Sequence, residues 1–208
     1  MTRIFITILI IFSGFTFGVE VKAQVISKII AECTITYSVT IEGSNNGQTV
    51  KNLYIKGRKT RSEISNSSFY QATLYDNKEG SAVVMKEVGG DKYISFFTAA
   101  EWKEKNNIWD SSTITLTSET KKIVSYNCRK AIIQTKNGNR YNVYFTTDMT
   151  ASATENPYQF KNITGLILEY ESESKDGKNV RCMATDISFI PVPAAKFVIP
   201  TSGYRVIK

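Results

Sequence analysis

The densest group of side chains that could do chemistry is a row of acidic residues in the C-terminal half of the chain. Glu169, Glu171 and Glu173 occupy alternate positions, and Asp176 follows at the next turn. In a β-strand, alternate side chains lie on one face with about 7 Å between neighbours. Such a row could hold a calcium ion or supply a general acid and base. The hydrated outer face of a sheet produces the same pattern, and we favour this second interpretation.

The chain contains no histidine, which excludes Ser-His-Asp and Cys-His nucleophiles, histidine general bases and imidazole zinc sites. Cys33, Cys128 and Cys182 are too far apart for a CxxC motif. Gly89-Gly90 begins neither a dinucleotide-binding nor a P-loop pattern. A histidine-free hydrolase of the Ser-Lys type is the least favoured alternative, since nothing in the sequence distinguishes a particular Ser-Lys pair. We predict a protein that is not an enzyme, without catalytic residues, metal or cofactor.

The elements that would position any site centre on the stretch Tyr126–Glu173. Its alternating pattern predicts three β-strands, the second and third joined by the loop after Asp148. Asn137-Gly138 between the first two predicts a type I′ hairpin, because that turn needs positive φ at both central residues. Asp176-Gly177 predicts the next hairpin, to a strand that begins near Cys182.

One face of these strands is apolar and aromatic, and we assign it to ligand binding. The assignment rests on apolarity alone, because a register slip of one residue would turn every side chain to the opposite face. The candidate ligand-binding residues are Tyr141, Val143, Phe145, Leu166, Leu168 and Tyr170.

The rest of the chain also favours short strands separated by turns such as Asn46-Gly47. Helix-like spacing over Gln24–Glu32 predicts a short N-terminal helix. Thr98-Ala99-Ala100-Glu101 is a capping box that predicts a second helix, carrying Trp102 and ending by Asn106. Trp102 and the nearby Trp109 could line a pocket or plug one end of the sheet, and we favour the plug.

The N-terminus has the pattern of a secretory signal peptide. Arg3 precedes an apolar run from Ile4 to Phe17, and Val21-Lys22-Ala23 fits a cleavage site. The run is shorter than the roughly 20 residues that a membrane-spanning helix needs. We expect residues 1–23 to be removed, which leaves residues 24–208 as one exported domain, periplasmic or extracellular, without a transmembrane span.

The formal net charge of +7 is scattered along the chain, which suits an anionic membrane surface better than nucleic acid, so no nucleic-acid partner is expected. The densest basic run, Lys56–Arg61, could contact phosphate or lipid headgroups. We favour a solvated hairpin end, since no aromatic residues interleave with the charges. Three cysteines in an exported chain leave one unpaired. Cys128 with Cys182 is the favoured disulfide among three pairings.

The loop Met149–Lys161 is long for a hairpin connection, which is typical of a lid over a binding site. A disordered surface loop is the alternative. The candidate residues for the lid or mouth are Met149, Pro157, Tyr158 and Phe160.

Motifs in the second half of the chain resemble those of exported Bacteroidetes proteins, the GLPGLI family and its relatives of unknown function. They are Lys122–Ala131, Tyr144–Asp148 and Gly165–Glu169, and Pro193–Tyr204 resembles the tail of that group. These proteins are similar in fold to the outer-membrane lipoprotein carrier, LolA. The resemblance implies a LolA-like half-barrel, wrapped over a short helix, whose concave face takes an acyl chain or another apolar ligand.

We therefore predict a mainly β fold: a single curved antiparallel sheet, or half-barrel, with one or two short helices. The first functional hypothesis is a cell-envelope protein that binds a lipid or acyl chain on the concave face. The alternative is a packed interaction module that docks an envelope protein through Tyr70, Tyr75 and Tyr93 or through a free sheet edge.

Overall fold

The structure is a computed structural model that describes residues 27–44, 48–174 and 176–207. Within these ranges it contains fourteen strands and three short helices. The strands are β1 (Lys28–Ile30), β2 (Glu32–Ile41), β3 (Thr49–Lys56), β4 (Lys59–Ser65), β5 (Phe69–Asp76), β6 (Ala82–Val88), β7 (Asp91–Phe97), β8 (Thr113–Ile123), β9 (Tyr126–Gln134), β10 (Arg140–Thr146), β11 (Met149–Ala151), β12 (Leu166–Glu173), β13 (Asn179–Ser188) and β14 (Arg205–Val206). The helices are α1 (Ala99–Lys105), η1 (Asn107–Trp109) and η2 (Ala194–Phe197), of which only α1 is α-helical.

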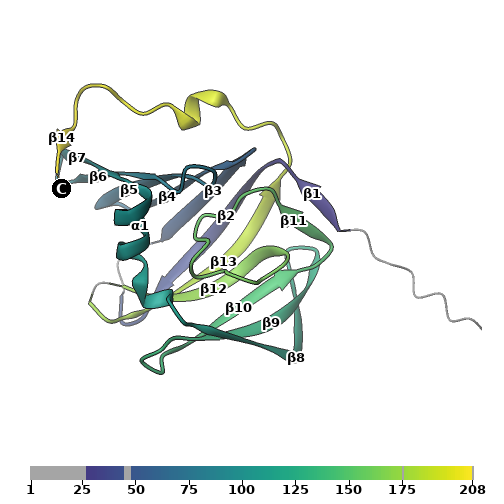
Figure 1. The fold of residues 1–208 in the computed structure, drawn as a ribbon. Helices are drawn as coiled ribbons and strands as arrows, with labels where there is room; N and C mark the ends of the chain where they lie inside the picture. Colours follow the sequence, from purple (N-terminus) through teal and green to yellow (C-terminus); the bar gives the residue numbers. More distant parts are fainter. Residues whose placement is uncertain (1–26, 45–47, 175, 208) are drawn as a thin grey trace, which may run out of the picture.

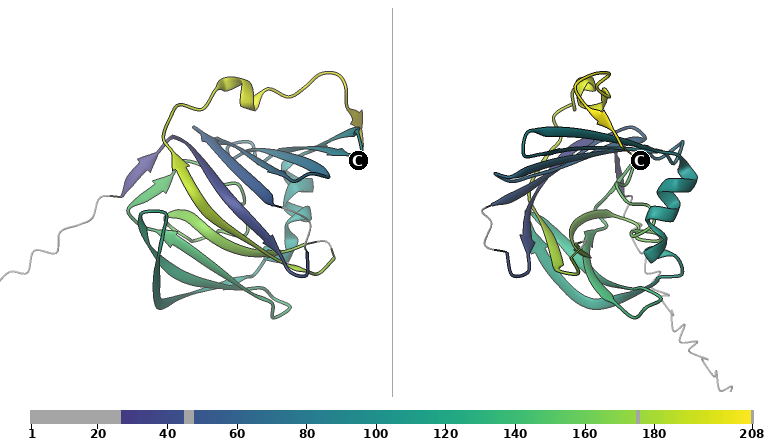
Figure 2. Two further views of the ribbon diagram at one scale, coloured as in Figure 1. Left: turned by 180° about the vertical axis from the view of Figure 1, so that it is seen from behind. Right: turned by 90° about the vertical axis from the view of Figure 1, so that its left-hand side faces the viewer.

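Twelve of the described strands form one sheet in the order β14-β7-β6-β5-β4-β3-β2-β13-β12-β10-β9-β8. Neighbours are antiparallel except for the short parallel pair of β14 and β7. The sheet is strongly curved, and α1 lies across its open side (Figures 1 and 2). The predicted mainly β, curved antiparallel sheet with a short helix is confirmed.

Alternation along each strand sends one set of side chains to the concave face. Tyr37 and Ile35 of β2 lie opposite Lys51 and Leu53 of β3 in the ladder, and all four are buried. The main hydrophobic core forms there, between β2, β3, β10 and β12 and the loop 152–165. A smaller cluster on the convex face packs Met85 and its neighbours under the C-terminal segment. Because a sheet must cover both faces, the tail and the loop are integral to the fold.

The hairpin between β9 and β10 differs from the predicted type I′ turn. Gly138 has a φ of +91°, whereas Asn137 is not among the described residues with positive φ. The Gly138 amide donates to the Thr135 carbonyl at 2.9 Å, and the Thr135 amide donates to the Asn139 carbonyl at 2.9 Å. The Thr135 hydroxyl bonds to the Asn137 side chain at 2.5 Å. This side-chain bond favours a longer loop that needs only one left-handed residue.

The predicted N-terminal helix is wrong over the part of Gln24–Glu32 that the structure describes. Lys28–Ile30 is β1, which pairs in parallel with β11, and β2 begins at Glu32. The partner strand is more than a hundred residues away in the sequence, so local periodicity could not reveal it. The signal-peptide prediction for residues 1–23 and the Asn46-Gly47 turn lie outside the described residues.

The predicted Cys128–Cys182 disulfide is not formed, because Cys33, Cys128 and Cys182 are all free and buried. Cys128 lies on β9 and Cys182 on β13, with β10 and β12 between them. Strands lie about 4.8 Å apart, whereas a disulfide needs Cα atoms within about 7 Å. Burial raises the pKa of Cys33 and of Cys128 to about 11, so both thiols are protonated at neutral pH.

Thiol titration tests this arrangement. The native protein should react negligibly with a thiol reagent at mildly alkaline pH, because buried, protonated thiols are poor nucleophiles. In denaturant without reductant, three thiols per chain should react. One reactive thiol in denaturant would show that a disulfide exists after all.

Gly165 precedes β12 at a position where a side chain cannot fit. Its φ is +153°, and an added Cβ would lie 2.4 Å from the Thr146 carbonyl oxygen. Gly43 also has positive φ, +67°, but an added Cβ there meets nothing within 4 Å.

Replacing these two glycines separates steric clash from backbone strain. Gly43→Ala should cost about 1 kcal/mol, the price of a left-handed non-glycine residue. Gly165→Ala should cost about 3 kcal/mol, because the clash with backbone adds to the strain. Urea unfolding of both variants gives the comparison, and equal losses would contradict the close approach of Gly165 to the end of β10.

Candidate functional site

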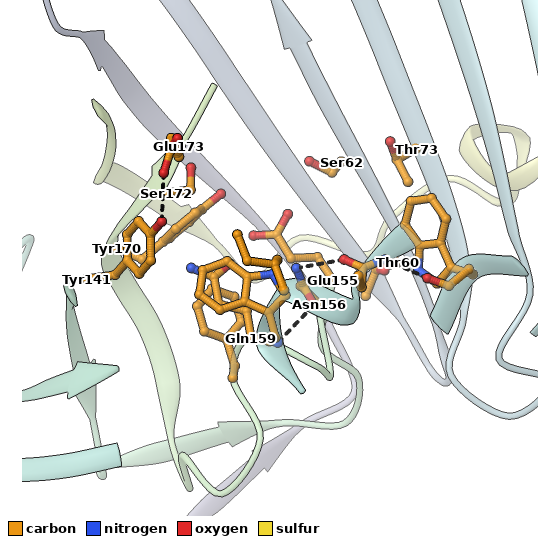
Figure 3. A pocket seen from close by; sticks show the side chains of 15 residues that line it. Thr60, Ser62, Thr73, Tyr141, Glu155, Asn156, Gln159, Tyr170, Ser172 and Glu173 are labelled. Atoms are coloured by element: carbon orange, nitrogen blue, oxygen red, sulfur yellow. Dashed lines mark hydrogen bonds between the residues drawn. The ribbon is translucent and has the colours of Figure 1, made fainter. Parts of the chain in front are cut away.

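A pocket of about 340 Å³ lies on the concave side of the sheet, between strands β4, β5, β10 and β12 and the α1–η1 segment (Figure 3). One part of its lining is aromatic: Trp102, Trp109, Tyr141, Phe160 and Tyr170. The other part is polar and includes Thr60, Ser62, Thr73, Asn156, Gln159 and Glu173. The pocket therefore combines flat apolar surfaces with hydrogen-bonding groups.

The predicted capping box places α1 at the edge of this pocket. The Thr98 hydroxyl accepts from the Glu101 amide at 3.3 Å, and the Glu101 carboxylate accepts from the Thr98 amide at 2.8 Å. Trp102 on this helix packs against Phe97, with ring centroids 5.4 Å apart. The helix ends at Asn106, whose side chain donates to the Trp102 carbonyl at 2.8 Å.

The 3-10 turn that follows α1 brings the second tryptophan to the opposite wall. Trp109 contacts Tyr141 edge to face, with centroids 5.1 Å apart. The Tyr141 hydroxyl donates to Glu173 at 3.0 Å. Trp102 and Trp109 thus both line the pocket. From the sequence, lining a pocket was the alternative, and plugging one end of the sheet was the favoured interpretation.

Two buried polar atoms of the pocket lining lack a hydrogen-bond partner: the Thr60 hydroxyl and the Trp102 indole N–H. Leaving such a group unpaired costs about 1–3 kcal/mol, so most buried polar groups in proteins are satisfied. Thr60 is only 1% exposed. Both residues line the same hollow, so its wall contains a hydroxyl and an indole N–H that lack partners.

The floor of the concave face contains a buried ion pair. The Lys51 ammonium on β3 donates to both oxygens of Glu155, at 2.5 and 2.6 Å, and also to the Tyr170 hydroxyl. It lies 5.2 Å from the centre of the Tyr37 ring and 4.7 Å from that of Tyr170. The Lys51 side chain is 5% exposed and that of Glu155 is 13% exposed. Burial of this charge is tolerated because the carboxylate, the hydroxyl and two ring faces surround it.

Burial raises the pKa of the titratable groups around the ion pair. Burial, and then the negative charge of Glu155, raises the pKa of Tyr37 well above its usual value. Burial, and then the neighbouring Cys182, does the same for the pKa of Tyr170. Burial also raises the pKa of the Cys182 thiol. Each of these groups is therefore protonated at neutral pH.

The sequence identified the correct concave face for most of the candidate ligand-binding residues. Val143 lies directly opposite Tyr170 in the ladder, and Tyr141 and Tyr170 line the pocket. Val143 and Leu168 are fully buried beneath it. Their ligand-binding role stays a prediction.

The last two candidates lie beyond an irregularity of the ladder. The register between β10 and β12 shifts between Tyr144 and Phe145. Leu166 lines a second hollow of about 220 Å³ beside Ile55. Phe145 instead borders a separate surface depression with Leu116 and Arg129. The register shift therefore separates Phe145 from the other five.

The predicted lid loop lies inside the curve of the sheet (Figures 1 and 2). Met149 belongs to β11 and is buried. Phe160 packs edge to face on Tyr170 at 5.2 Å and lines both hollows. Pro157 and Tyr158 are half-buried. The loop fills much of the concave face, and its opening as a lid stays a prediction.

The acidic row of β12 is only in part the hydrated outer face that the sequence suggested: Glu173 is exposed and Glu171 half-buried, whereas Glu169 is buried. Glu169 is 3% exposed and bonds to Lys121 at 2.5 Å and to Arg181 at 3.0 Å. Glu171 accepts from the Asn142 amide at 2.8 Å. Glu173 faces the pocket lining. The row is split because basic and amide partners come from neighbouring strands, which the sequence pattern alone does not place.

The tyrosines proposed for docking a protein are also less exposed than expected. Tyr75 is buried beside Trp102, whereas Tyr70 and Tyr93 are half-buried. The Tyr70 hydroxyl is occupied by Arg61 and Glu63.

Sequence reasoning missed Lys51, Glu155 and Thr60. Lys51 could have been recognised from the sequence, because alternation along β3 places it on the same side as Thr49, Leu53 and Ile55, which is a core position for a lysine. Thr60 was read only as part of a basic run. Among the described residues, no group of three His, Cys, Asp or Glu side chains could hold a metal ion. None of the described helices is long and apolar enough to span a membrane.

The family model for the N-terminal domain of the N-glycanase peptide matches residues 55–192. The chain belongs to this family. Membership of the GLPGLI family, which the motifs suggested, is not shown. No curated protein matches the chain significantly.

Solved structures with a similar fold were also found. PNGF-II superposes with a TM-score of 0.51 at 18% identity, over 85% of this chain and 31% of that protein. The chain thus spans about a third of its length. An uncharacterised conserved protein from Thermus thermophilus gives a TM-score of 0.51 at 10% identity, over 84% of this chain and 89% of that one. A LolA superfamily protein from Nitrosomonas europaea gives 0.36 at 10%, over 82% and 91%. At these identities the likeness concerns the fold alone.

Removing one member of the buried ion pair should strongly destabilise the domain. Lys51→Met leaves Glu155 buried without its partner and should cost about 3 kcal/mol. Adding Glu155→Leu should recover most of that loss, because no unpaired charge remains. Chemical denaturation of the two singles and the double gives the coupling energy. As a control, Lys78→Met breaks an exposed pair and should change stability by less than about 0.5 kcal/mol. Additive losses at Lys51 and Glu155 would contradict the proposed coupling.

Proposed function

We propose that this chain is an exported, non-catalytic binding domain that holds a carbohydrate in its concave pocket. The observation that supports this most is the pairing of aromatic walls with two buried polar atoms that lack partners, Thr60 and Trp102. A sugar ring presents an apolar face of C–H groups and a rim of hydroxyls, each of which can donate and accept.

The lining is suited to such a ligand. Trp109 and Tyr141 offer aromatic surface for the apolar face of a ring. Asn156, Gln159 and Glu173 offer amide and carboxylate groups for hydroxyls. A site built with buried polar groups rejects ligands that leave those groups unpaired. An unbranched acyl chain would do so in this pocket.

The family supports the same ligand class. Its description refers to an N-glycanase, a protein that acts on glycans. The chain covers less than a third of PNGF-II, so binding is proposed here and not the activity of the whole enzyme. The buried, protonated groups of the floor also favour binding over catalysis.

For the apolar-ligand hypothesis, the candidate site is the second hollow, which lies beneath the loop. Leu53, Ile55, Ile163 and Leu166 line its 220 Å³ together with Phe160. An acyl chain is therefore the second candidate ligand, in that hollow. The proposal of export rests on the N-terminal pattern of residues 1–23. If it is correct, the mature protein should begin at Gln24.

Intrinsic fluorescence tests the carbohydrate proposal, because the only two tryptophans of the chain both line the pocket. Titration with oligosaccharides of N-acetylglucosamine and mannose should shift the emission saturably. Trp109→Ala should weaken binding at least about tenfold, through loss of stacking worth about 1–2 kcal/mol. Phe96→Ala, which removes an exposed aromatic outside the pocket, should leave the affinity unchanged.

A parallel titration with a fluorescent fatty acid separates the two ligand classes. Carbohydrate binding without fatty-acid binding supports the main proposal. Fatty-acid binding that Leu166→Gln abolishes, with no response to sugars, would replace it with the acyl-chain candidate. No response to either ligand class by the folded protein would contradict both.

A further inference from the structure

The basic run Lys56–Arg61 forms the tip of the β3–β4 hairpin and divides into distinct roles. Gly57, with a φ of +58°, and Arg58 make the turn. Thr60 points to the concave pocket, and Arg61 bonds to Glu63 on the convex face. At the tip, the guanidinium of Arg58 makes no ion pair with any described residue. The basic run is therefore neither wholly solvated nor wholly structural.

A second basic element lies beside this tip. The Asn77 amide donates to the Arg58 carbonyl at 2.9 Å, which holds the β5–β6 turn against the hairpin. Lys78 of that turn is well exposed, with only a 3.3 Å surface pair to Glu79. Together with the start of η2, the two turns border a hollow of about 370 Å³. Its charged lining is Lys56, Arg58, Lys59, Lys78 and Asp76, and its apolar lining is Ala194 and Phe197.

Exposed aliphatic side chains gather at the same end of the sheet. Ile190 is 75% exposed and Ile29 is 72% exposed, the two highest values among the described large hydrophobics. Both are held near the hairpin: the Gly57 amide donates to the Ala31 carbonyl at 2.8 Å. The Lys56 ammonium donates to the Val192 carbonyl at 3.0 Å. In both Figures 1 and 2, β1, the end of β13 and the start of the tail meet at this corner.

We propose that this end of the sheet docks on the surface of an anionic phospholipid membrane. Ile29, Ile190 and the neighbouring Phe189, which is 46% exposed, would enter the interface between headgroups and acyl chains. The cationic hollow beside Arg58 and Lys78 would receive a headgroup phosphate. Exposed apolar residues beside a basic cluster are the combination that binds membrane interfaces. This proposal does not depend on the ligand of the concave pocket.

The docking geometry leaves the concave pocket accessible. The hairpin tip, Ile29 and Ile190 lie at one end of the strands. Pocket residues such as Ser172, Glu173 and Tyr141 come from the opposite ends of β12 and β10. A domain seated on a membrane by the first end would keep this part of the pocket away from the lipid, while Thr60 lines the pocket next to the hairpin tip.

Flotation with lipid vesicles tests the proposal. The purified protein should bind vesicles that contain phosphatidylglycerol and not pure phosphatidylcholine vesicles, and added salt should weaken the binding. The double variant R58E/K78E should reduce the partition coefficient at least about tenfold, since each basic residue near the surface contributes roughly fivefold. The matched control K136E/K178E makes the same charge change in exposed turns at the opposite end and should change it by less than about twofold.

The apolar contribution has its own variant. Ile190→Ser changes an exposed side chain, so the fold should be kept, and binding to anionic vesicles should fall several-fold without a change in salt dependence. Circular dichroism and unfolding curves confirm that each variant is folded. Three results would overturn the proposal: no binding to anionic vesicles, equal losses in R58E/K78E and K136E/K178E, or binding of inorganic phosphate by calorimetry without any binding to vesicles.

Discussion

The constraint on which the structure depends is that a sheet bent this strongly must cover its inner face. In the C-terminal half, the loop 152–165 does so by placing Phe160 against Tyr170 and Glu155 against Lys51. The ion pair is costly to bury and is offset by the Tyr170 hydroxyl and the two tyrosine rings. Because Lys51 has its partner on the loop, the loop has one well-defined position, and that position decides which part of the concave face is filled and which is left hollow.

The hollow that remains has a mixed character for the same reason. Glu155 and its neighbours on the loop bring amides and a carboxylate to one side. The α1–η1 segment brings two tryptophans to the lining, held there by the capping box at Thr98 and the contact of Trp109 with Tyr141. The strands contribute hydroxyls such as Thr60. A hydrocarbon-like concave face, the expectation from sequence, is met only in part: Leu53, Ile55 and Leu166 line the hollow beneath the loop together with Ser152, Thr154 and Glu155.

The direction of the strands gives the domain two unlike ends. One end contributes Tyr141 of β10 and Glu173 of β12 to the pocket, whereas the other carries Arg58, Lys78 and exposed isoleucines. The convex face is closed by the C-terminal segment, where Lys196 bonds to Glu63 and Tyr204 bonds to Glu87. The proposed binding surfaces are the pocket and the basic end, and one molecule could use both at once.

The sequence by itself determined the strands of Tyr126–Glu173, the capping box and the curved antiparallel class, since these depend on period-two alternation, turn glycines and local side-chain bonds. Tertiary structure decided the partners. The parallel pairing of β1 with β11, the separation of Cys128 from Cys182, and the burial of Glu169 between Lys121 and Arg181 each join residues far apart in the chain. The meeting of Lys51 with Glu155 belongs to the same group. Local pattern specifies which face a side chain takes, but only the folded sheet brings charges from different segments within bonding distance.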